Sequence, residues 1–459
     1  MCPYLIPCSR TRLCVVLLNE EIVRLSWILL ACVLLSACAT NDTSESAATL
    51  PDSVMNPIAE QYVKLVLAVG EHDDGYVDAY YGPAEWQAEI EQAPPSLDSI
   101  MARGARLVTE LQEIDVSEAE ELVQQRRAYL ERQLQAVLAR VRMLQGAEFA
   151  FDEESQALYD ATAPTYEESH FQALVDSLDA ALPGAGPVYA RVAAFKRDFI
   201  IPPERLDTVF RAAIAEARRR TAEHLELPAE EDFVLEYVQD KSWSGYNWYQ
   251  GNARSLIQIN TDLPIYIDRA IDLAAHEGYP GHHVYNALLE KNLVDGRGWA
   301  EYSVYPLYSP QSLIAEGSAN YGIDVAFPGE DRLAFERDVL YPIAGIDTAR
   351  ADEYRRVQRL VDALSYAGNE AARMYLNGRI DADSAAAWLT TYALMEPERA
   401  QQRVRFFDNY RSYVINYNYG RDLVAEWVEG QGGTADDPAR RWNVFGTLLS
   451  TPRLPSGLR

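Results

Sequence analysis

The sequence predicts a mainly α-helical, multihelical protein with one small β-sheet. Beyond about residue 55, apolar residues recur three and four positions apart through most of the chain, which is the period of one helix face. Two short segments, 233–238 and 255–260, instead alternate or run apolar with β-branched residues, and this pattern favours strands. With 459 residues, of which 48% are hydrophobic, the chain can bury a large core in one domain or in two lobes.

The N-terminal 38 residues are predicted to form a lipoprotein signal peptide. The apolar run 25–38 is shorter than the roughly 20 residues that a bilayer-spanning helix needs, and it ends in small residues, as signal peptides do. Its end, Leu35-Ser-Ala-Cys38, resembles the lipobox of bacterial lipoproteins, in which the cysteine is acylated after cleavage. Cys38 is therefore the predicted lipid anchor, and residues 39–54 are the predicted tether. An ordinary secretory signal cleaved nearby, or a short buried helix, is the alternative.

The residues on either side of this signal bear on location and on the translation start. In bacterial lipoproteins an aspartate directly after the anchor cysteine retains the protein in the inner membrane, and Ala39 stands at that position. We therefore expect attachment to the outer membrane, with the protein facing the periplasm or the cell exterior. Residues 1–22 contain two glutamates and two prolines and fit a signal peptide poorly, which a translation start assigned too far upstream would explain.

Charge and cysteine content exclude several classes of function. The formal net charge is −28, from 69 acidic and 41 basic residues, so the surface repels phosphate groups and nucleic acid is not an expected partner. All five cysteines precede residue 39. The rest of the chain therefore has no disulfide, no thiolate metal ligand and no cysteine nucleophile.

Helical elements follow the tether. Residues 57–70 present an apolar stripe that begins with a proline and ends with a glycine, both typical helix boundaries. A second helix is expected to open with the capping box Ser117-Glu-Ala-Glu120 and to end near Gly146. The segment 203–225 repeats the helical pattern.

The predicted sheet lies in the middle of the chain. Segments 233–238 and 255–260 flank the turn signal Gly251-Asn252. The second segment is a candidate edge strand that pairs with an extended peptide, with Asn260 at its end as a substrate-binding residue, and a strand buried by helices is the alternative. Helical pattern resumes afterwards and covers 264–293, 310–327 and most of the remainder to Val428.

Three of the six histidines lie in the eight-residue run His276-Glu-Gly-Tyr-Pro-Gly-His-His283. Closely spaced imidazoles beside a carboxylate, inside a helical pattern, indicate a metal site. On a regular helix two ligands stand four residues apart, whereas His282 and His283 follow the first histidine by six and seven. Pro280 has no N–H to donate, and the glycines around it tolerate unusual dihedral angles, so we expect a bulged or kinked turn. A two-residue bulge would bring His282 to the required position, and His283 remains a rival ligand.

These residues resemble a known family. The run from His276 to His283, preceded by the strand at 255–260 and followed by Ala315-Glu-Gly317, resembles the bacterial domain-of-unknown-function family 885, which is grouped with the gluzincin-type zinc metallopeptidases. The resemblance in organisation covers most of the chain after about residue 55, and its specific part is roughly 255–325. It implies a gluzincin-like multihelical fold with the small sheet beside the active-site helix, and one zinc ion.

The resemblance also implies a role for each residue of the motif. His276 and His282 become the histidine ligands and Glu316 the third protein ligand, which leaves a fourth position on zinc for water. Glu277 becomes the general base that deprotonates this water. His283 becomes a residue that binds substrate or the oxyanion, an alternative ligand, or a hydrogen-bonding neighbour of the site.

Two departures from the family pattern concern the shape of the pocket. Ser318 replaces the tryptophan of the family's Glu-Gly-Trp-Ala-Leu-Tyr-type motif, and Ile323 takes a place that is usually acidic. Two further carboxylates, Glu301 and Asp324, remain rivals of the third ligand.

Other candidates for the site come from later helices. The transition-state anion needs a hydrogen-bond donor besides the metal, and related peptidases often use a tyrosine of a later helix. Tyr366 stands where the family tends to have a Leu-Ser/Ala-Tyr string, and the tyrosine-rich segment 410–420, with Tyr417 and Tyr419, is the other candidate and a predicted substrate-binding wall. Because the chain has 28 tyrosines, core packing is the alternative for any single one. Three arginines are candidates to hold a substrate's terminal carboxylate, which would favour carboxypeptidase action: Arg403, Arg405 and Arg411. Solvated charges on a helix surface are the alternative for all three.

These features together predict a zinc-dependent peptidase, tethered by lipid, that hydrolyses peptide bonds in the cell envelope. We expect an N-terminal helical half, 55–230, and a catalytic half, 231–459, around a deep cleft. One alternative is a zinc-dependent hydrolase or lyase of a non-peptide amide. The other is a non-catalytic envelope lipoprotein that uses the fold for binding, against which the intact Glu277 argues. Endo- and exopeptidase action, side-chain preference and oligomeric state remain open.

Overall fold

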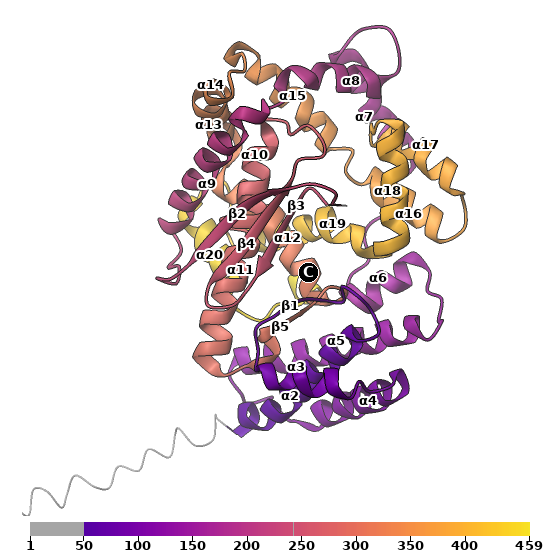
Figure 1. Ribbon diagram of the computed structural model, residues 1–459, viewed down its shortest axis with the longest axis vertical. Coiled ribbons are helices and arrows are strands. Elements are labelled where there is room, and N and C mark those ends of the chain that lie inside the picture. Colours follow the sequence, from indigo (N-terminus) through magenta and orange to yellow (C-terminus); the bar gives the residue numbers. More distant parts are fainter. Residues whose placement is uncertain (1–49, 242) are drawn as a thin grey trace, which may run out of the picture. The chain divides into compact units, whose positions relative to one another are not determined.

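Helices form most of the part of the chain described by the computed structural model, which comprises residues 50–241 and 243–459 (Figure 1). The predicted class, mainly α with a small sheet, is therefore confirmed. The predicted signal peptide and its anchor Cys38 lie outside the described residues. In chain order the helices are α2 (Leu50–Gly70), α3 (Ala84–Gln92), α4 (Leu97–Glu113), α5 (Glu121–Leu144), α6 (Phe151–Tyr159), α7 (Glu168–Ala181), α8 (Val188–Lys196), α9 (Leu206–Ala222), α10 (Asp268–Leu273), α11 (His282–Leu289), α12 (Pro310–Ala326), α13 (Gly329–Phe335), α14 (Tyr341–Ala344), α15 (Ala351–Asp362), α16 (Ala367–Leu376), α17 (Ala382–Tyr392), α18 (Pro397–Tyr410), α19 (Ile415–Gly430) and α20 (Pro438–Ser450).

Three predicted helices are found, but the first begins at Leu50, within the predicted tether and seven residues before Pro57, which therefore lies inside the helix and does not start it. Segment 57–70 lies within α2, segment 203–225 corresponds to a 3₁₀ turn followed by α9, and segment 310–327 corresponds to α12. The predicted capping box at Ser117 is wrong, because α5 begins only at Glu121 without a side-chain cap. The Ser117 N–H instead donates to the carboxylate of Asp115 at 2.9 Å, so a local turn competes successfully with the helix cap.

The main sheet has the strand order β2-β4-β3. Strand β2 (Asp232–Val238) is parallel to β4 (Arg254–Asn260), and β3 (Gly245–Tyr249) is antiparallel to β4. The predicted edge position of residues 255–260 is wrong, because β4 lies between the other two strands. The turn signal at Gly251-Asn252 joins β3 to β4 as a hairpin, and β3, which sequence patterns missed, takes an edge position.

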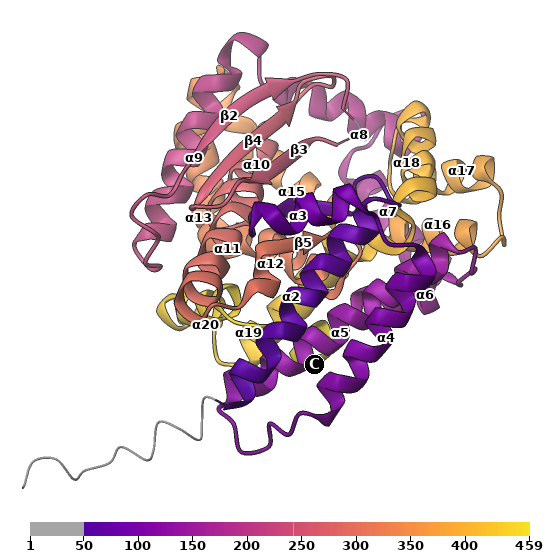
Figure 2. The same cartoon turned by 60° about the horizontal axis from the view of Figure 1, so that its bottom comes forward.

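One face of this sheet packs against the helices that lead to the histidine motif. Ile257 and Ile259 of β4 are buried in a cluster with Phe210 of α9 and Leu273 of α10. Alternate residues of a strand point to the same side, so this cluster fixes which face of β4 is inside. Both views show α9, α10 and α11 beside the sheet (Figures 1 and 2).

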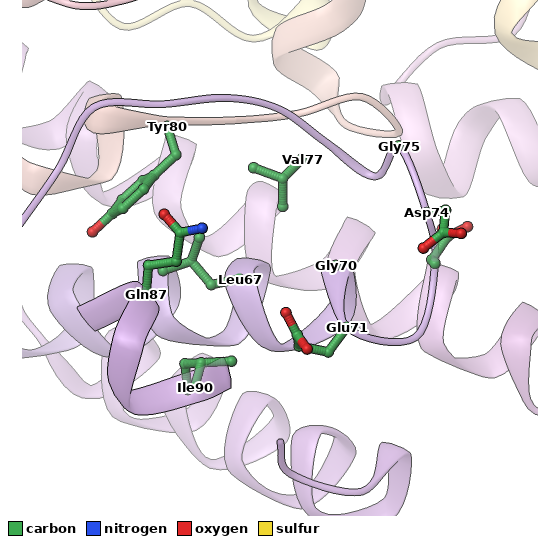
Figure 3. Close-up of a pocket in the computed structure, with 10 residues that line it drawn as sticks. Leu67, Gly70, Glu71, Asp74, Gly75, Val77, Tyr80, Gln87 and Ile90 are labelled. Atoms are coloured by element: carbon green, nitrogen blue, oxygen red, sulfur yellow. The ribbon is translucent and has the colours of Figure 1, made fainter. Parts of the chain in front are cut away.

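A second, antiparallel sheet joins the N-terminal helices to the segment before α12. It pairs β1 (Val77–Tyr80) with β5 (Val304–Pro306). A cavity of about 240 Å³ lies between β1 and the helices α2 and α3, and Leu67, Val77 and Ile90 are among the residues that line it (Figure 3). Its lining includes no residue of the histidine motif, so it is separate from the predicted site.

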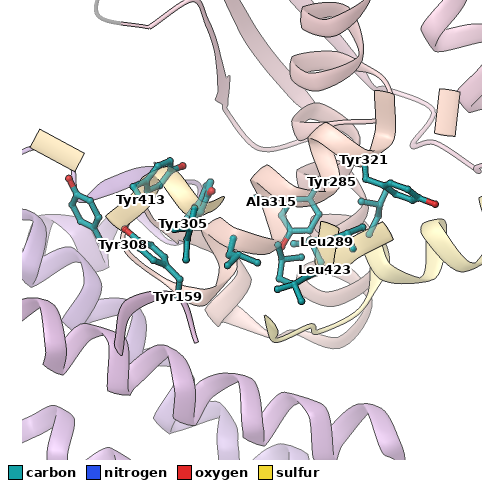
Figure 4. Close-up of a cluster of buried hydrophobic side chains, with 14 of the residues drawn as sticks. Tyr159, Tyr285, Leu289, Tyr305, Tyr308, Ala315, Tyr321, Tyr413 and Leu423 are labelled. Carbon is teal, nitrogen blue, oxygen red and sulfur yellow. The ribbon is translucent and has the colours of Figure 1, made fainter. Parts of the chain in front are cut away.

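Helices α12 and α19 approach each other closely at a pair of glycines. A Cβ atom at Gly317 would lie 2.4 Å from the carbonyl carbon of Gly420, so a larger residue would push the helices apart. This contact brings α12, which carries Glu316, against the tyrosine-rich segment. Figure 4 shows part of the surrounding core, in which four tyrosines gather at one end: Tyr159, Tyr305, Tyr308 and Tyr413.

Residues Pro51–Arg459 belong to one compact unit. The expected division of this unit into halves at residue 230 stays a prediction. Within the described ranges, every helix is too short or too polar to cross a lipid bilayer.

Candidate metal centre

The helix that leads into the histidine motif is interrupted. Helix α10 continues as a π-helical turn, Ala274–Gly278, in which the Tyr279 N–H donates at 3.0 Å to the carbonyl five residues earlier. The chain then leaves the helix for three residues, and α11 begins at His282. A Cβ atom at Gly281 would lie 1.9 Å from the carbonyl oxygen of His276, so only glycine fits this turn. The distortion predicted from the proline and glycines is confirmed.

This interruption brings two histidines together with a glutamate of α12. The Nε2 atoms of His276 and His282 are 3.1 Å apart, and Glu316 Oε2 lies 3.3 Å from the first and 3.8 Å from the second. These three side chains form a group of ligand atoms, found among the described residues, that can hold a metal ion. The structure thus assembles the predicted ligand set, with His282 rather than His283 facing Glu316.

The hydrogen bonds around these atoms suit a cation. His276 Nδ1 lies 3.2 Å from Asn320 Oδ1, an acceptor, so the ring proton is on Nδ1 and Nε2 presents a lone pair. Glu316 Oε2 is buried and makes no hydrogen bond within the described ranges, although it lies 3.3 Å from His276 Nε2. Lone pairs that face one another repel unless positive charge lies between them. Zinc bound tetrahedrally at about 2.0–2.2 Å holds its ligand atoms roughly 3.3 Å apart, so the residues fit this ion.

The electrostatics of the group also favour a positive charge. Burial opposes protonation of His282, but the carboxylate of Glu316, and beyond it those of Glu277 and Asp78, outweigh burial and raise the His282 pKa to about 9. Burial likewise opposes ionisation of Glu316, but His276 and His282 hold the Glu316 pKa well below its usual range. An arrangement that attracts a proton this strongly also attracts a divalent cation.

Glu277 is held beside the ligands by the edge strand β3. It is 4% exposed, and its main-chain carbonyl accepts a hydrogen bond from Asn247 Nδ2 at 2.7 Å. Its carboxylate is one of those that raise the pKa of His282. Adjacent residues of a helix diverge by about 100°, so Glu277 lies next to the ligand group without joining it.

His283 belongs to a separate buried network. Its Nδ1 lies 2.9 Å from Ser255 Oγ and its Nε2 lies 3.1 Å from Glu231 Oε2. The Glu231 carboxylate also accepts hydrogen bonds from the Tyr279 hydroxyl and, at 2.9 Å, from Arg218 Nε. Burial opposes ionisation of Glu231, but these hydrogen bonds hold its pKa below the usual range. Both ring nitrogens of His283 are occupied, so this histidine ties the distorted turn to the sheet.

The two rival carboxylates have partners of their own. Glu301 is fully buried, and its two oxygens accept hydrogen bonds from Arg126 at 2.7 and 3.0 Å. Asp324 pairs with Arg421 at 2.6 Å. Glu316 is therefore the carboxylate that the structure brings to the histidines.

The structure distinguishes between the candidate tyrosines. The hydroxyl of Tyr366 donates to Asp422 of α19 at 2.7 Å, so it is already engaged in a hydrogen bond. The alternative segment, 410–420, does contact the ligand group. The Tyr413 hydroxyl donates to Glu316 Oε1 at 2.8 Å, and the ring centroids of Tyr413 and Tyr417 are 5.7 Å apart. Burial raises the pKa of Tyr417 well above its usual value, and the carboxylates of Glu316 and Glu277 raise it further. Tyr417 therefore lies within the electrostatic reach of the site.

Three other predicted substrate-binding residues have partners away from the ligand group. Asn260 donates to two main-chain carbonyls of the loop before β3. Arg411 forms an ion pair with Glu154, so its guanidinium is already occupied and it is poorly suited to hold a substrate. Tyr419 acts electrostatically on the phenol of Tyr366 and helps to raise that pKa.

The structure adds a residue that sequence patterns missed. Asp78 of β1 accepts a hydrogen bond from the Tyr246 hydroxyl of β3. Burial raises the pKa of Asp78 to about 6; this hydrogen bond and His282 oppose the rise, and the charges of Glu316 and Glu277 add to it. Nothing in the local sequence marks Asp78, because its proximity to the site depends on long-range strand pairing. The other contacts that sequence patterns missed come from Asn247, Asn320 and Glu231.

Comparisons with known proteins give a likeness of fold. No protein-family profile matches the chain, and no curated protein matches it. Among solved structures, the chain is similar to a candidate lipoprotein from Colwellia psychrerythraea, with 15% sequence identity and a TM-score of 0.52, over 81% of this chain and 70% of that chain. It also aligns with the M32 carboxypeptidase from Deinococcus radiodurans R1, with 14% identity and a TM-score of 0.35, over 88% of this chain and 92% of that chain. The first likeness shows a shared fold alone, and the second is too weak to support an argument.

Proposed function

We propose that the protein is a zinc-dependent peptidase that uses one zinc ion. The observation that carries this proposal is the convergence of His276 Nε2, His282 Nε2 and Glu316 Oε2, with separations of 3.1–3.8 Å, directly beside Glu277. Two imidazoles and one carboxylate leave a fourth coordination position open, which is typical of catalytic rather than structural zinc sites.

The side chains around the ligands divide the chemistry among them. Zinc in such a site supplies a Lewis acid and makes water a nucleophile near neutral pH. Glu277 accepts the proton of the attacking water and later delivers it to the leaving amine nitrogen. Tyr413 holds Glu316 Oε1 by a hydrogen bond, which leaves Oε2 for the metal. The Tyr417 hydroxyl forms no hydrogen bond with another described residue and donates to the carbonyl oxygen of the scissile bond as negative charge develops.

The edge strand β3 supports a peptide as the substrate. Strand β3 pairs with β4 and, within the described part of the chain, with no other strand. The Asn260 N–H donates to the Ser244 carbonyl, so by alternation the main-chain groups of Gly245, Asn247 and Tyr249 point away from β4. An extended peptide can add to such an edge through main-chain hydrogen bonds. Because Asn247 also holds Glu277, a peptide paired there would lie beside the general base.

The cellular location is part of the proposal. The apolar run that ends at Cys38 supports lipid attachment after signal cleavage, which would place the protein in the cell envelope. We propose the outer membrane, with the peptidase facing the periplasm or the exterior.

Peptide digestion by the purified protein, followed by mass spectrometry, tests the proposed activity. The zinc-loaded wild type should cleave peptides, a chelator should abolish cleavage, and added zinc should restore it. Glu277→Gln should bind one zinc ion per chain yet lose about 10²- to 10⁴-fold in kcat. Glu330→Gln, an exposed site in α13, is the matched control and should change neither property. Undiminished cleavage by Glu277→Gln would contradict the role of Glu277 as general base. If the zinc-loaded protein hydrolysed non-peptide amides but no peptides, its substrates would be those amides and not peptides.

A further inference from the structure

Arg403 of α18 is a cation that lacks an anionic partner. It forms neither an ion pair nor a hydrogen bond with any other described residue, and its Nε is buried. Its guanidinium carbon lies 4.3 Å from the ring centroid of Phe406 and 5.7 Å from that of Phe407. A buried donor without an acceptor costs stability, and the chain has 69 acidic residues from which a partner could have come. The missing partner therefore points to an anion from outside the chain.

The structure separates Arg403 from two other arginines of the same segment. Arg405 stands two positions further along α18, on another face of the helix, and is exposed. Arg411 is paired with Glu154, which is 1% exposed and also accepts a hydrogen bond from the Ser412 N–H at 3.1 Å. Of the three arginines that the sequence offers for carboxylate binding, Arg403 is the one with an unoccupied guanidinium against buried surface.

Tyr417 connects Arg403 with the metal centre. Burial raises the pKa of Tyr417 well above its usual value, the Glu316 carboxylate raises it further, and the Arg403 cation lowers it. The Tyr417 ring lies 5.7 Å from the ring of Tyr413, whose hydroxyl donates to Glu316. Glu316 and the unpaired Arg403 therefore both act electrostatically on one phenol, which places Arg403 on the Tyr417 side of the candidate metal centre.

A second unpaired cation stands one helical turn away on the same face of α18. Arg399 forms no ion pair within the described ranges, and although it is exposed, the surrounding protein lowers its pKa by desolvation and Arg269 of α10 lowers it further. Burial also lowers the pKa of Arg403, and Arg399 adds to this effect. Arg399 is thus repelled by both Arg403 and Arg269. Arg269 pairs with Asp272, and Glu396 at the start of α18 only partly offsets the repulsion. A bound anion would relieve this repulsion.

We propose that Arg403, assisted by Arg399, binds the C-terminal carboxylate of a peptide, so that the enzyme hydrolyses peptides from their C-terminal end. This inference rests on the proposed peptidase function. A planar carboxylate matches the guanidinium fork in bidentate geometry. In each turnover one water adds across a peptide bond near the C-terminus: the C–N bond breaks, a C–O bond forms, and a proton passes to the amine that leaves. An aspartate or glutamate side chain carries the same pair of oxygens, and the test separates the two sources.

Three versions of one hexapeptide provide the test. The first ends in a free carboxylate, the second in an amide, and the third in an amide on a C-terminal aspartate. Their kcat and KM are measured with zinc-loaded protein, and their dissociation constants are measured by calorimetry on Glu277→Gln. The wild type should prefer the free acid over the plain amide by roughly 10- to 100-fold, mainly through KM and the dissociation constant.

Matched variants locate this preference at one side chain. Arg403→Gln should reduce the preference for the free acid to near unity, and Arg403→Lys should retain part of it because charge remains while the bidentate fork is lost. Arg405→Gln removes the same charge from the exposed face of the same helix and should behave as the wild type. Circular dichroism shows whether each variant is folded, and the peptide comparison on the wild type decides the question by itself if Arg403→Gln is not.

The outcomes separate the two proposals. Equal zinc-dependent cleavage of the free acid and the plain amide would overturn the carboxylate site and leave the peptidase standing. An aspartyl amide as good as the free acid would overturn the terminal assignment. The proposed peptidase function itself would be overturned if the zinc-loaded protein cleaved none of the peptides and Glu277→Gln bound none of them.

Discussion

Gly281→Ala is expected to open the turn that brings the two histidine ligands together. The added Cβ would lie 1.9 Å from the carbonyl oxygen of His276 and 2.4 Å from that of Ala275, and neither main-chain atom can rotate away. Because real Cβ contacts are essentially never shorter than 3.0 Å, the two segments must separate by at least the difference, 1.1 Å. His282 follows Gly281 directly, so its Nε2 should move relative to that of His276 by a similar distance.

A displacement of this size should weaken zinc binding. Bond lengths in zinc sites vary by only about 0.2 Å. A ligand atom displaced by about 1 Å must therefore be pulled back to the metal, and this strains the protein. We expect the zinc dissociation constant to rise by roughly 10- to 100-fold, the range found when contacts that orient ligands are removed. Overpacking should also lower the free energy of unfolding of the metal-free protein by about 1–3 kcal/mol.

Competition with a chromophoric chelator measures the zinc affinity, and urea denaturation of the metal-free protein measures its stability. Gly368→Ala in α16 is the matched control, because no atom lies within 4 Å of a Cβ at that position. This control should bind zinc as the wild type does. If Gly281→Ala also kept the wild-type zinc affinity, the turn would not set the ligand positions.

Three further predictions concern side chains whose roles the structure separates. His282→Ala should abolish tight zinc binding. His283→Ala should still bind one zinc ion, but its free energy of unfolding should fall by about 1–3 kcal/mol because two buried hydrogen bonds are lost. Zinc titration and urea denaturation of both variants check this. Arg411→Gln should destabilise the protein by about 1–3 kcal/mol in urea denaturation, because the buried Glu154 loses its charged partner, and should leave the choice between peptide acid and amide unchanged. Glu216 has its pKa lowered from 4.5 to about 2 by hydrogen bonds from two arginines of α9, so its contribution is present above pH 4.5 and is lost as the pH falls toward 2. Urea denaturation should therefore show Glu216→Gln less stable than the wild type by under about 1 kcal/mol at pH 6, since its partners are partly solvated, and equally stable near pH 2.

The ligand set could be predicted because its signal is local. Two of the three proposed ligands and the proposed general base lie within one eight-residue run, and helix geometry shows that a regular helix cannot bring its histidines together. Pro280 and the glycines then predict where the helix is distorted, and the structure has its π-helical turn and helix break at that place. The third ligand, Glu316, needed the resemblance to a family, since one glutamate on a helix has no pattern of its own.

The residues that support the site could not be predicted, because each comes from a distant element. Asn320 fixes the tautomer of His276 from α12, and Asp78 reaches the site through the pairing of β1 with β5. The wrong edge position for β4 has a related cause. Alternation of apolar residues along a strand shows which face is buried, but it contains no information on which strands lie on either side.

The adjacent histidines of α11 show how one short segment supplies both a ligand and its support. Successive side chains on a helix diverge by about 100°, so when His282 faces Glu316, His283 must face another direction. That direction is toward Ser255 and Glu231, and both ring nitrogens of His283 find partners there. These contacts fix the rotation of α11 about its own axis, and this rotation aims His282 at the other two ligands. Loss of His283 should therefore reduce stability first and zinc affinity second, whereas loss of a true third histidine ligand would reduce them in the opposite order.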